Sequence, residues 1–181
     1  MEIEIAKGVA IQIDDKNVSV KGPKGKASQD FNDPRFNDLV VIVKEGDKIK
    51  VYTDSDKKKI KAIIRTIGSQ IKNMVMGTSE GFVYKLKITY IHFPMTVEVK
   101  GKEVHIKNFL GEKGARIAKI MGDAEVKIQK DEVSVTGADK KAVSQTAANI
   151  EQVCSVKKLD RRVFQDGIYI TGKFLQNGEA V

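Results

Sequence analysis

Residues 10–25, AIQIDDKNVSVKGPKG, align with residues 96–111, TVEVKGKEVHIKNFLG, without a gap. Four apolar positions of the first segment (Ile11, Ile13, Val18 and Val20) coincide with Val97, Val99, Val104 and Ile106 of the second. The segments 47–52 and 131–136 match next, in the same order, and each precedes a helical pattern. Because order and apolar register repeat together, the sequence predicts two copies of one unit, over residues 1–80 and 81–181.

Each predicted copy begins with β-strands and ends with a helix. Apolar residues alternate within 10–20 and 96–106, which is typical of a hairpin with one buried face. A second strand pair is predicted at 39–44 with 48–52, and at 125–129 with 132–136. Apolar residues then recur every three or four positions in 56–76 and 139–154, as in an amphipathic helix. The predicted fold is α+β, with two tandem duplicated units, each an antiparallel β-sheet covered by one α-helix.

Three details of this prediction concern single segments. Ser55 or Asp56 is expected to cap the first helix, and Gly77 is expected to end it. Residues 82–93, FVYKLKITYIHF, alternate in polarity but do not fit inside a repeat. They are therefore predicted to form a long strand that bridges the two copies.

The charge of the chain favours a nucleic-acid partner. The 181 residues contain 32 Lys and Arg against 24 Asp and Glu, for a net charge of +8. The net charge is +3 over 1–80 and +5 over 81–181, and five basic residues fall within 157–173. Cationic surfaces attract nucleic acid through its phosphates, although a modest charge excess also serves solubility. No segment has the length and apolarity of a spanning helix or a signal peptide, so we expect an intracellular protein.

Catalytic and metal-binding motifs are not found in the sequence. His92 and His105 lack the spacing of a metal site, and Cys154, as the single cysteine, excludes an internal disulfide and a cysteine-based zinc site. No nucleophile elbow, Walker sequence or dinucleotide fingerprint occurs. We therefore expect no enzyme activity, no catalytic residue, no metal and no cofactor or small-molecule substrate.

Three basic segments are candidates for RNA contact. Two glycine-bracketed loops, at 22–26 and 111–116, can bring backbone amides and lysines to phosphates, or can simply be tight turns. The third segment, 157–173, combines five basic residues with Tyr169, on which a base can stack; a solvated basic helix end is the alternative. The predicted rRNA-binding residues are Lys113, Arg116, Lys157, Lys158, Arg161, Arg162, Tyr169 and Lys173, with Lys21, Lys24 and Lys26 as secondary candidates.

The sequence also resembles a known family over nearly its whole length. The resemblance rests on KGPKG (21–25), RTIGSQIKNMVMG (65–77), GFVYKLKITYIHFP (81–94), IKNFLGEKGAR (106–116) and RRVFQDGIYI (161–170). These strings are similar to the large-subunit ribosomal protein numbered six, in the branch shared by archaea and eukaryotes. Leu159 departs from the family, which has a basic residue there. The absence of long basic extensions looks archaeal.

The resemblance implies a function that the residues alone do not. Members of this family are structural components of the large subunit in the cytoplasm. They bind large-subunit rRNA near the sarcin–ricin loop and the stalk base, beside other ribosomal proteins and the translation factors. They bind no membrane. Two alternatives remain open from the residues: an enzyme acting on RNA, and a regulatory RNA-binding protein outside the ribosome that uses the GxxG-type loops.

Overall fold

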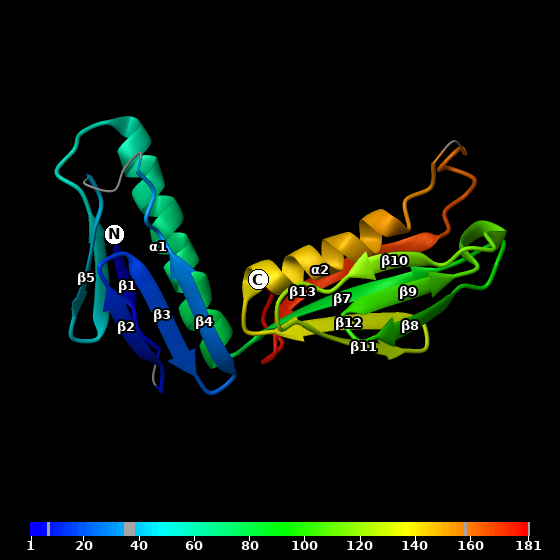
Figure 1. Ribbon diagram of the computed structural model, residues 1–181, viewed down its shortest axis with the longest axis horizontal. Helices are drawn as coiled ribbons and strands as arrows, with labels where there is room; N and C mark the ends of the chain where they lie inside the picture. Colours follow the sequence, from blue (N-terminus) through cyan, green and yellow to red (C-terminus); the bar gives the residue numbers. More distant parts are fainter. Residues whose placement is uncertain (7, 35–38, 158, 181) are drawn as a thin grey trace. The chain divides into compact units, whose positions relative to one another are not determined.

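The computed structural model describes residues 1–6, 8–34, 39–157 and 159–180 and divides the chain into unit 1, Met1–Gly81, and unit 2, Phe82–Val181. Each unit combines antiparallel strands with one long helix, which confirms the predicted α+β class (Figure 1). Among the described helices, none is long and apolar enough to cross a membrane. The two units are described separately below.

The described part of unit 1 contains six strands and helix α1 (Lys58–Ser79). One antiparallel sheet has the order β2-β3-β4 and the other the order β1-β6-β5. Four of these strands agree with prediction, namely β2 (Ala10–Asp14), β3 (Asn17–Gly22), β5 (Val41–Glu45) and β6 (Lys48–Tyr52). The strands β1 (Glu2–Glu4) and β4 (Gly25–Asp30) were not predicted, because each buries a single apolar side chain, Ile3 and Ala27.

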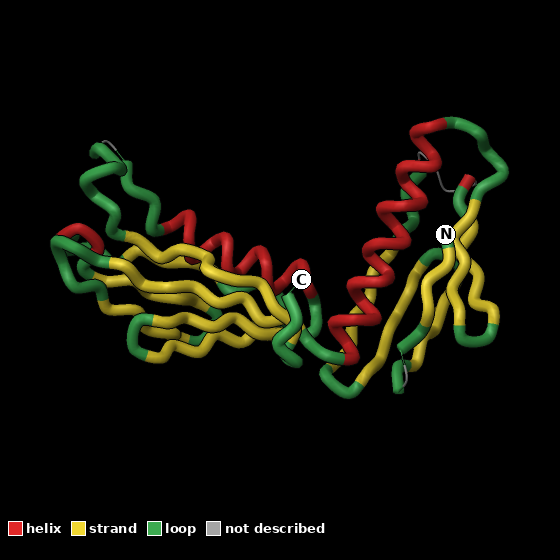
Figure 2. The backbone as a smooth tube through the Cα atoms, turned by 180° about the vertical axis from the view of Figure 1, so that it is seen from behind, coloured by secondary structure: helices red, strands yellow, loops and turns green. Residues whose placement is uncertain are grey.

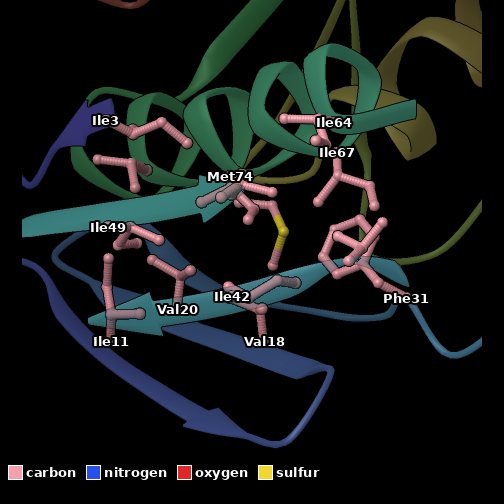
Figure 3. Packing of buried hydrophobic residues seen from close by; sticks show 14 of the residues in the cluster. Ile3, Ile11, Val18, Val20, Phe31, Ile42, Ile49, Ile64, Ile67 and Met74 are labelled. Carbon is pink, nitrogen blue, oxygen red and sulfur yellow. The ribbon is translucent and has the colours of Figure 1, made fainter. Parts of the chain in front are cut away.

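The Ile-rich stripe of α1 forms the core of unit 1. Side chains from Ile64 to Met74 pack against the inner faces of both sheets, on residues such as Val18 and Ile49, as Figure 3 shows. Burying an aliphatic side chain of this size contributes about 1.5–3 kcal/mol. The periodicity of the sequence therefore marks the core face of the helix rather than a partner-binding face.

The predicted ends of α1 are wrong. The N-cap residue is Lys57, which makes no side-chain cap, while the Asp56 carboxylate lies 2.7 Å from the Nζ atom of Lys61. The helix continues past Gly77 to Ser79, and the Glu80 amide still donates to the Met76 carbonyl at 2.9 Å. Gly81, with a φ of 79°, follows the C-cap residue Glu80. That backbone conformation suits glycine and ends the helix.

Unit 2 contains a four-stranded and a three-stranded antiparallel sheet. The larger sheet has the order β11-β12-β7-β13 and the smaller one the order β10-β9-β8. Its elements are β7 (Phe82–Thr89), β8 (Thr96–Lys100), β9 (Glu103–Lys107), β10 (Arg116–Lys119), β11 (Glu125–Gln129), β12 (Glu132–Gly137), α2 (Lys140–Val153) and β13 (Gly167–Leu175). The Asp139 side chain caps α2 by accepting from the Lys141 amide at 2.9 Å.

One face of the larger sheet is covered and the other is open. Helix α2 packs on the covered face, where Tyr84, Leu86 and Ile168 are buried together with Val143 and Ile150 of the helix. Side chains between these positions, such as Lys85 and Lys87, point to the opposite face and are exposed. This alternation is the pattern of a sheet with one solvated face.

The prediction that residues 82–93 form a strand bridging the two units is wrong. The strand β7 ends at Thr89 and lies in the middle of the larger sheet, paired with β12 on one side and β13 on the other. Its apolar residues belong to the core of unit 2 alone. The alternation was correctly recognised as a strand, but the sequence gives no pairing partners.

Candidate nucleic-acid interface

Three loops meet at one end of unit 2, where α2 ends and β13 begins (Figure 2). They are the segments 90–95, 108–115 and 154–166, which we call the loop end. The side-chain amide of Asn108 joins the first two by donating to the Pro94 carbonyl at 2.9 Å. Two further residues, Arg116 and Asp166, connect the third loop to the others.

Arg116 holds the loop 108–115 against the end of α2. Its Nη1 atom donates to the carbonyls of Val153 at 2.6 Å and Ser155 at 3.2 Å, and its other nitrogens donate to the Glu112 carboxylate at 2.7 and 2.8 Å. The guanidinium also lies 4.2 Å from the centroid of the Phe109 ring. Because hydrogen bonds from Arg116 favour the charged carboxylate, the pKa of Glu112 is lowered. Arg116 is thus engaged within the protein and shapes the loop end.

Asp166 joins the loop 90–95 to the segment 154–166. Its carboxylate accepts from the amides of Ile91 at 2.5 Å and His92 at 3.3 Å, and Nδ1 of His92 lies 3.1 Å from it. The His92 ring stacks on Phe164, with ring centroids 4.7 Å apart. Burial raises the pKa of Asp166, but the hydrogen bonds from Ile91 and His92 outweigh burial, so the pKa is lowered.

Four of the predicted basic residues lie at the loop end. Lys113, Lys157 and Arg161 are exposed, and Arg162 is exposed but pairs with the Asp160 carboxylate at 2.8 Å. Hydrogen bonds from Arg162 lower the pKa of Asp160. Lys158, which was also predicted, lies outside the described residues. The loop end therefore gathers positive charge on loops that are tied to one another.

A basic groove adjoins the loop end, between β10 and the last turns of α2. It has a volume of about 640 Å³ and is lined by Arg116, Lys119 and Lys157, with Asn149 and Gln152 among the polar side chains. Sequence reasoning missed Lys119. Its signal was its position in the strand after the GEKGAR loop, one residue after the buried Ala118, so that its side chain points outward.

Tyr169 and Lys173, also predicted as contacts, lie on opposite faces of β13. Tyr169 pairs with Lys87 on the open face, whereas Lys173 pairs with the buried Tyr84 on the covered face. The register shifts between Ile170 and Gly172, so Thr171 is an extra residue in the strand. Such a bulge reverses the alternation of the side chains that follow it. The strand therefore separates two residues that the sequence grouped together.

In unit 1, the segment 22–26 is the tight turn of a hairpin. Lys24 lies in the turn, and its amide donates to the Thr78 carbonyl at 3.0 Å, so this amide is not available to a phosphate. Lys21 and Lys26 are directly paired across β3 and β4, and a pocket of about 480 Å³ is lined by both and by Lys24. Like charges that face each other across strands repel. An anion held between these side chains would relieve that repulsion.

The described part of the chain gives little support for metal binding or for a reactive cysteine or histidine. No group of three or more His, Cys, Asp or Glu residues there is arranged to hold a metal ion. Cys154 is buried, and burial raises its pKa to about 12, so the thiol is protonated at neutral pH. His105 is turned toward Glu103, with 3.1 Å between Nε2 and the carboxylate.

Comparison with known proteins identifies relatives along nearly the whole chain. The family model described as ribosomal protein L6 matches twice, over residues 5–81 and 93–167, which confirms the duplication. The chain is 47% identical over 173 residues to large ribosomal subunit protein uL6 of Methanocella arvoryzae, covering 95% of this chain and 96% of the relative. It is 46% identical to the protein of the same name from Methanosarcina mazei, with 94% and 95% covered.

A third relative, from Ignicoccus hospitalis, has the same name and is 42% identical, with 93% of this chain and 91% of the relative covered. All three organisms are archaea, and the shared name is that of a ribosomal protein and not of an enzyme, in agreement with the sequence predictions. The double match to the family model and the identity along both units establish that this chain belongs to the ribosomal protein L6 family.

Proposed function

We propose that this protein is a structural component of the large ribosomal subunit in the cytoplasm and binds large-subunit rRNA through the loop end of unit 2. The observation that carries the proposal is the presence of Lys113, Lys157 and Arg161 on loops held in place by Arg116 and Asp166. Ordered loops lose less conformational entropy on binding than free ones. Relatives with high identity bear the name of a large-subunit protein, which supports the same assignment.

Each class of residue has a distinct role in the proposed contact. The exposed lysines neutralise phosphates as point charges, whereas Arg161 and Arg162 offer a planar fork to phosphate oxygens or base edges. Arg116 acts as a positioning residue, because its guanidinium already donates to Glu112 and to the end of α2. The hairpin with Lys21, Lys24 and Lys26 is a second, weaker contact, and Lys158, Tyr169 and Lys173 remain proposed contacts.

The location on the subunit is part of the proposal. We infer from the family resemblance that the bound rRNA lies near the sarcin–ricin loop and the base of the stalk. There the protein would support the RNA surface on which translation factors dock, beside neighbouring ribosomal proteins. In this proposal its contribution is binding and shape, with no catalytic step.

Protection of the rRNA from hydroxyl radicals tests both parts of the proposal. Large subunits are assembled with the wild-type protein or with the double variant Arg161→Ala, Arg162→Ala. The wild type should protect backbone near the sarcin–ricin loop, and the variant should lose that protection and dissociate from subunits in sucrose gradients. Protection elsewhere would overturn the location. Unchanged protection by the variant would overturn the loop end as the contact.

A further inference from the structure

Two aromatic rings on the open face of β13 each lie close to a glycine. A Cβ atom placed on Gly167 would come within 2.9 Å of the ring of Tyr169, and one placed on Gly172 would overlap the ring of Phe174. Each ring therefore covers the strand where a side chain is missing.

The bulge at Thr171 brings the two rings to the same face. In a regular strand, residues 169 and 174 would point to opposite sides, because five positions separate them. The extra residue reverses the alternation of the side chains that follow it. Tyr169 therefore pairs with Lys87 and Phe174 pairs with Val83, both on the open face. The Thr171 hydroxyl holds the bulge by donating to the Lys85 carbonyl at 3.1 Å.

Lysines accompany both rings. The Lys85 Nζ atom lies 5.7 Å from the centroid of the Phe174 ring, and Lys87 faces Tyr169 directly. Among the described residues, neither lysine forms an ion pair. We call Lys85, Lys87, Tyr169 and Phe174 the ring strip. It belongs to β7 and β13 and carries two positive charges, and on the same face Glu132 of β12 lies opposite Lys87.

Shielding two glycines does not by itself explain why two aromatic residues and two lysines lie together on this face. Aromatic side chains do compensate for glycine in strands, but alanine or a larger residue at 167 and 172 would remove that need. Tyr169 is instead 38% exposed, and its hydroxyl donates to the Gln165 carbonyl at 3.1 Å, which fixes the tilt of the ring. An exposed tyrosine and a half-buried phenylalanine beside lysines on an open sheet are the elements of a surface for single-stranded nucleic acid.

We propose that the ring strip binds an unpaired segment of RNA, with bases stacked on Tyr169 and Phe174 and phosphates near Lys85 and Lys87. This inference rests on the proposed RNA-binding function but uses a surface other than the loop end. The seats of the two rings, Gly167 and Gly172, pair with residues four positions apart on β7. They are thus separated by roughly 13 Å at about 3.4 Å per residue, so the segment spans both rings in an extended conformation.

Binding of the full chain to fluorescein-labelled oligouridylate, measured by anisotropy at one low salt concentration, tests the inference. The wild type should bind, and Phe174→Leu should weaken binding about 5-fold or more through the loss of one stacked base. The double variant Lys85→Gln, Lys87→Gln should weaken it as well without changing the rings. Lys61→Gln on α1 is the matched control, because it removes one positive charge outside both proposed contacts, and it should leave oligouridylate binding within about two-fold.

Photocrosslinking locates the contact directly. An oligonucleotide that contains 4-thiouridine should crosslink to the peptide carrying Tyr169 or Phe174. If the wild type does not bind oligouridylate, or if both the ring and the lysine variants bind as well as the wild type, the inference is wrong. Crosslinks confined to residues 157–166 would contradict it too. None of these results would affect protection of rRNA by the loop end, so the two proposals fail separately.

Discussion

The carboxylate of Asp166 lies 3.1 Å from Nδ1 of His92, although 74 residues separate the two in the chain. The same carboxylate accepts the amides of Ile91 and His92, and its side chain is only 1% exposed. A buried acceptor of three hydrogen bonds ties the loop 90–95 to the start of β13. The geometry of the proposed RNA contact depends on this connection.

Asp166→Ala should destabilise the protein strongly. The change leaves two partly buried backbone amides of the loop 90–95 without their acceptor, and a fully buried unmet donor costs about 1–3 kcal/mol. We expect the free energy of unfolding in urea to fall by roughly 2–4 kcal/mol. Asp160→Ala is the control, since Asp160 is exposed and should change stability by less than about 1 kcal/mol. Equal effects of the two changes would contradict the role of Asp166.

The lowered pKa of Asp166 predicts that the free energy of unfolding decreases at acid pH, where this carboxylate becomes protonated. A carboxyl group with a lower pKa in the folded state contributes its full stabilisation above the unfolded pKa, about 3.9. That contribution is lost as the pH falls through the lower pKa of the folded protein. The difference in unfolding free energy between Asp166→Asn and the wild type should therefore become smaller as the pH falls below about 4. A difference that stays constant from neutral pH into that range would rule out the charged carboxylate as the source.

Arg116→Lys should loosen the loop end despite the retained charge. Lysine cannot donate to Glu112 and to the carbonyls of Val153 and Ser155 together, because it lacks the planar fork. Hydrogen exchange at the last turn of α2 and in 108–115 should be faster, with a loss of about 1–2 kcal/mol in unfolding free energy. Lys107→Arg, on the neighbouring strand, is the control. Unaltered exchange in Arg116→Lys would mean that these contacts do not order the loop.

Removal of Lys113 and Lys157 should reduce the salt dependence of rRNA binding. If each neutralises one phosphate, the slope of log affinity against log salt should decrease by roughly 1.4–1.8 in the double alanine variant. The matched control is Lys61→Ala on α1, which lies outside both proposed contacts. An unchanged slope in the double variant would show that the two lysines are only solvated surface.

Asp160→Asn should increase rRNA affinity a few-fold. Arg162 now donates to Asp160, so part of its charge is neutralised within the protein. Asparagine removes the competing charge and leaves Arg162 free for a phosphate. The gain should vanish in the background of Arg162→Ala, which is the control. A gain that persists there would assign the effect to net charge instead.

Gly22→Ala should destabilise unit 1, because a Cβ atom there would overlap the carbonyl of Thr78 at the end of α1. Backbone cannot yield as a flexible side chain can, and overpacking of this kind costs about 1–3 kcal/mol. Gly114→Ala is the matched control, since nothing lies within 4 Å of its added atom. Comparable thermal stability of both variants would show that the turn adapts.

Local pattern was enough to predict most elements of both units. Alternation and helical spacing involve residues close in the chain, so they identified both helices, the hairpins and the second strand pairs within a few residues. The offset repeat gave the duplication in the same way. The C-terminal end of α1 escaped prediction, because backbone hydrogen bonds continue to Glu80 and the left-handed conformation of Gly81, rather than Gly77, ends the helix.

The composition of the candidate site was also visible in the sequence, but its arrangement was not. The basic residues of 157–162 and the GEKGAR loop could be identified as candidates from charge alone. That Arg116 donates its hydrogen bonds inward, and that Asp166 joins two loops, depends on contacts between segments far apart in the chain. Neither contact has a signature in local spacing.

In strand β13, part of the side-chain arrangement can be predicted from the sequence, and part of it depends on the tertiary structure. In the segment GIYITGKFL, alternation by itself places Ile168 and Tyr169 on opposite faces of a strand. Only pairing with β7 revealed that Thr171 is an extra residue, which moves Lys173 to the covered face and Phe174 to the side of Tyr169. A bulge depends on the hydrogen bonds between two strands. The polarity pattern of one strand alone does not show which residues of the partner strand it pairs with.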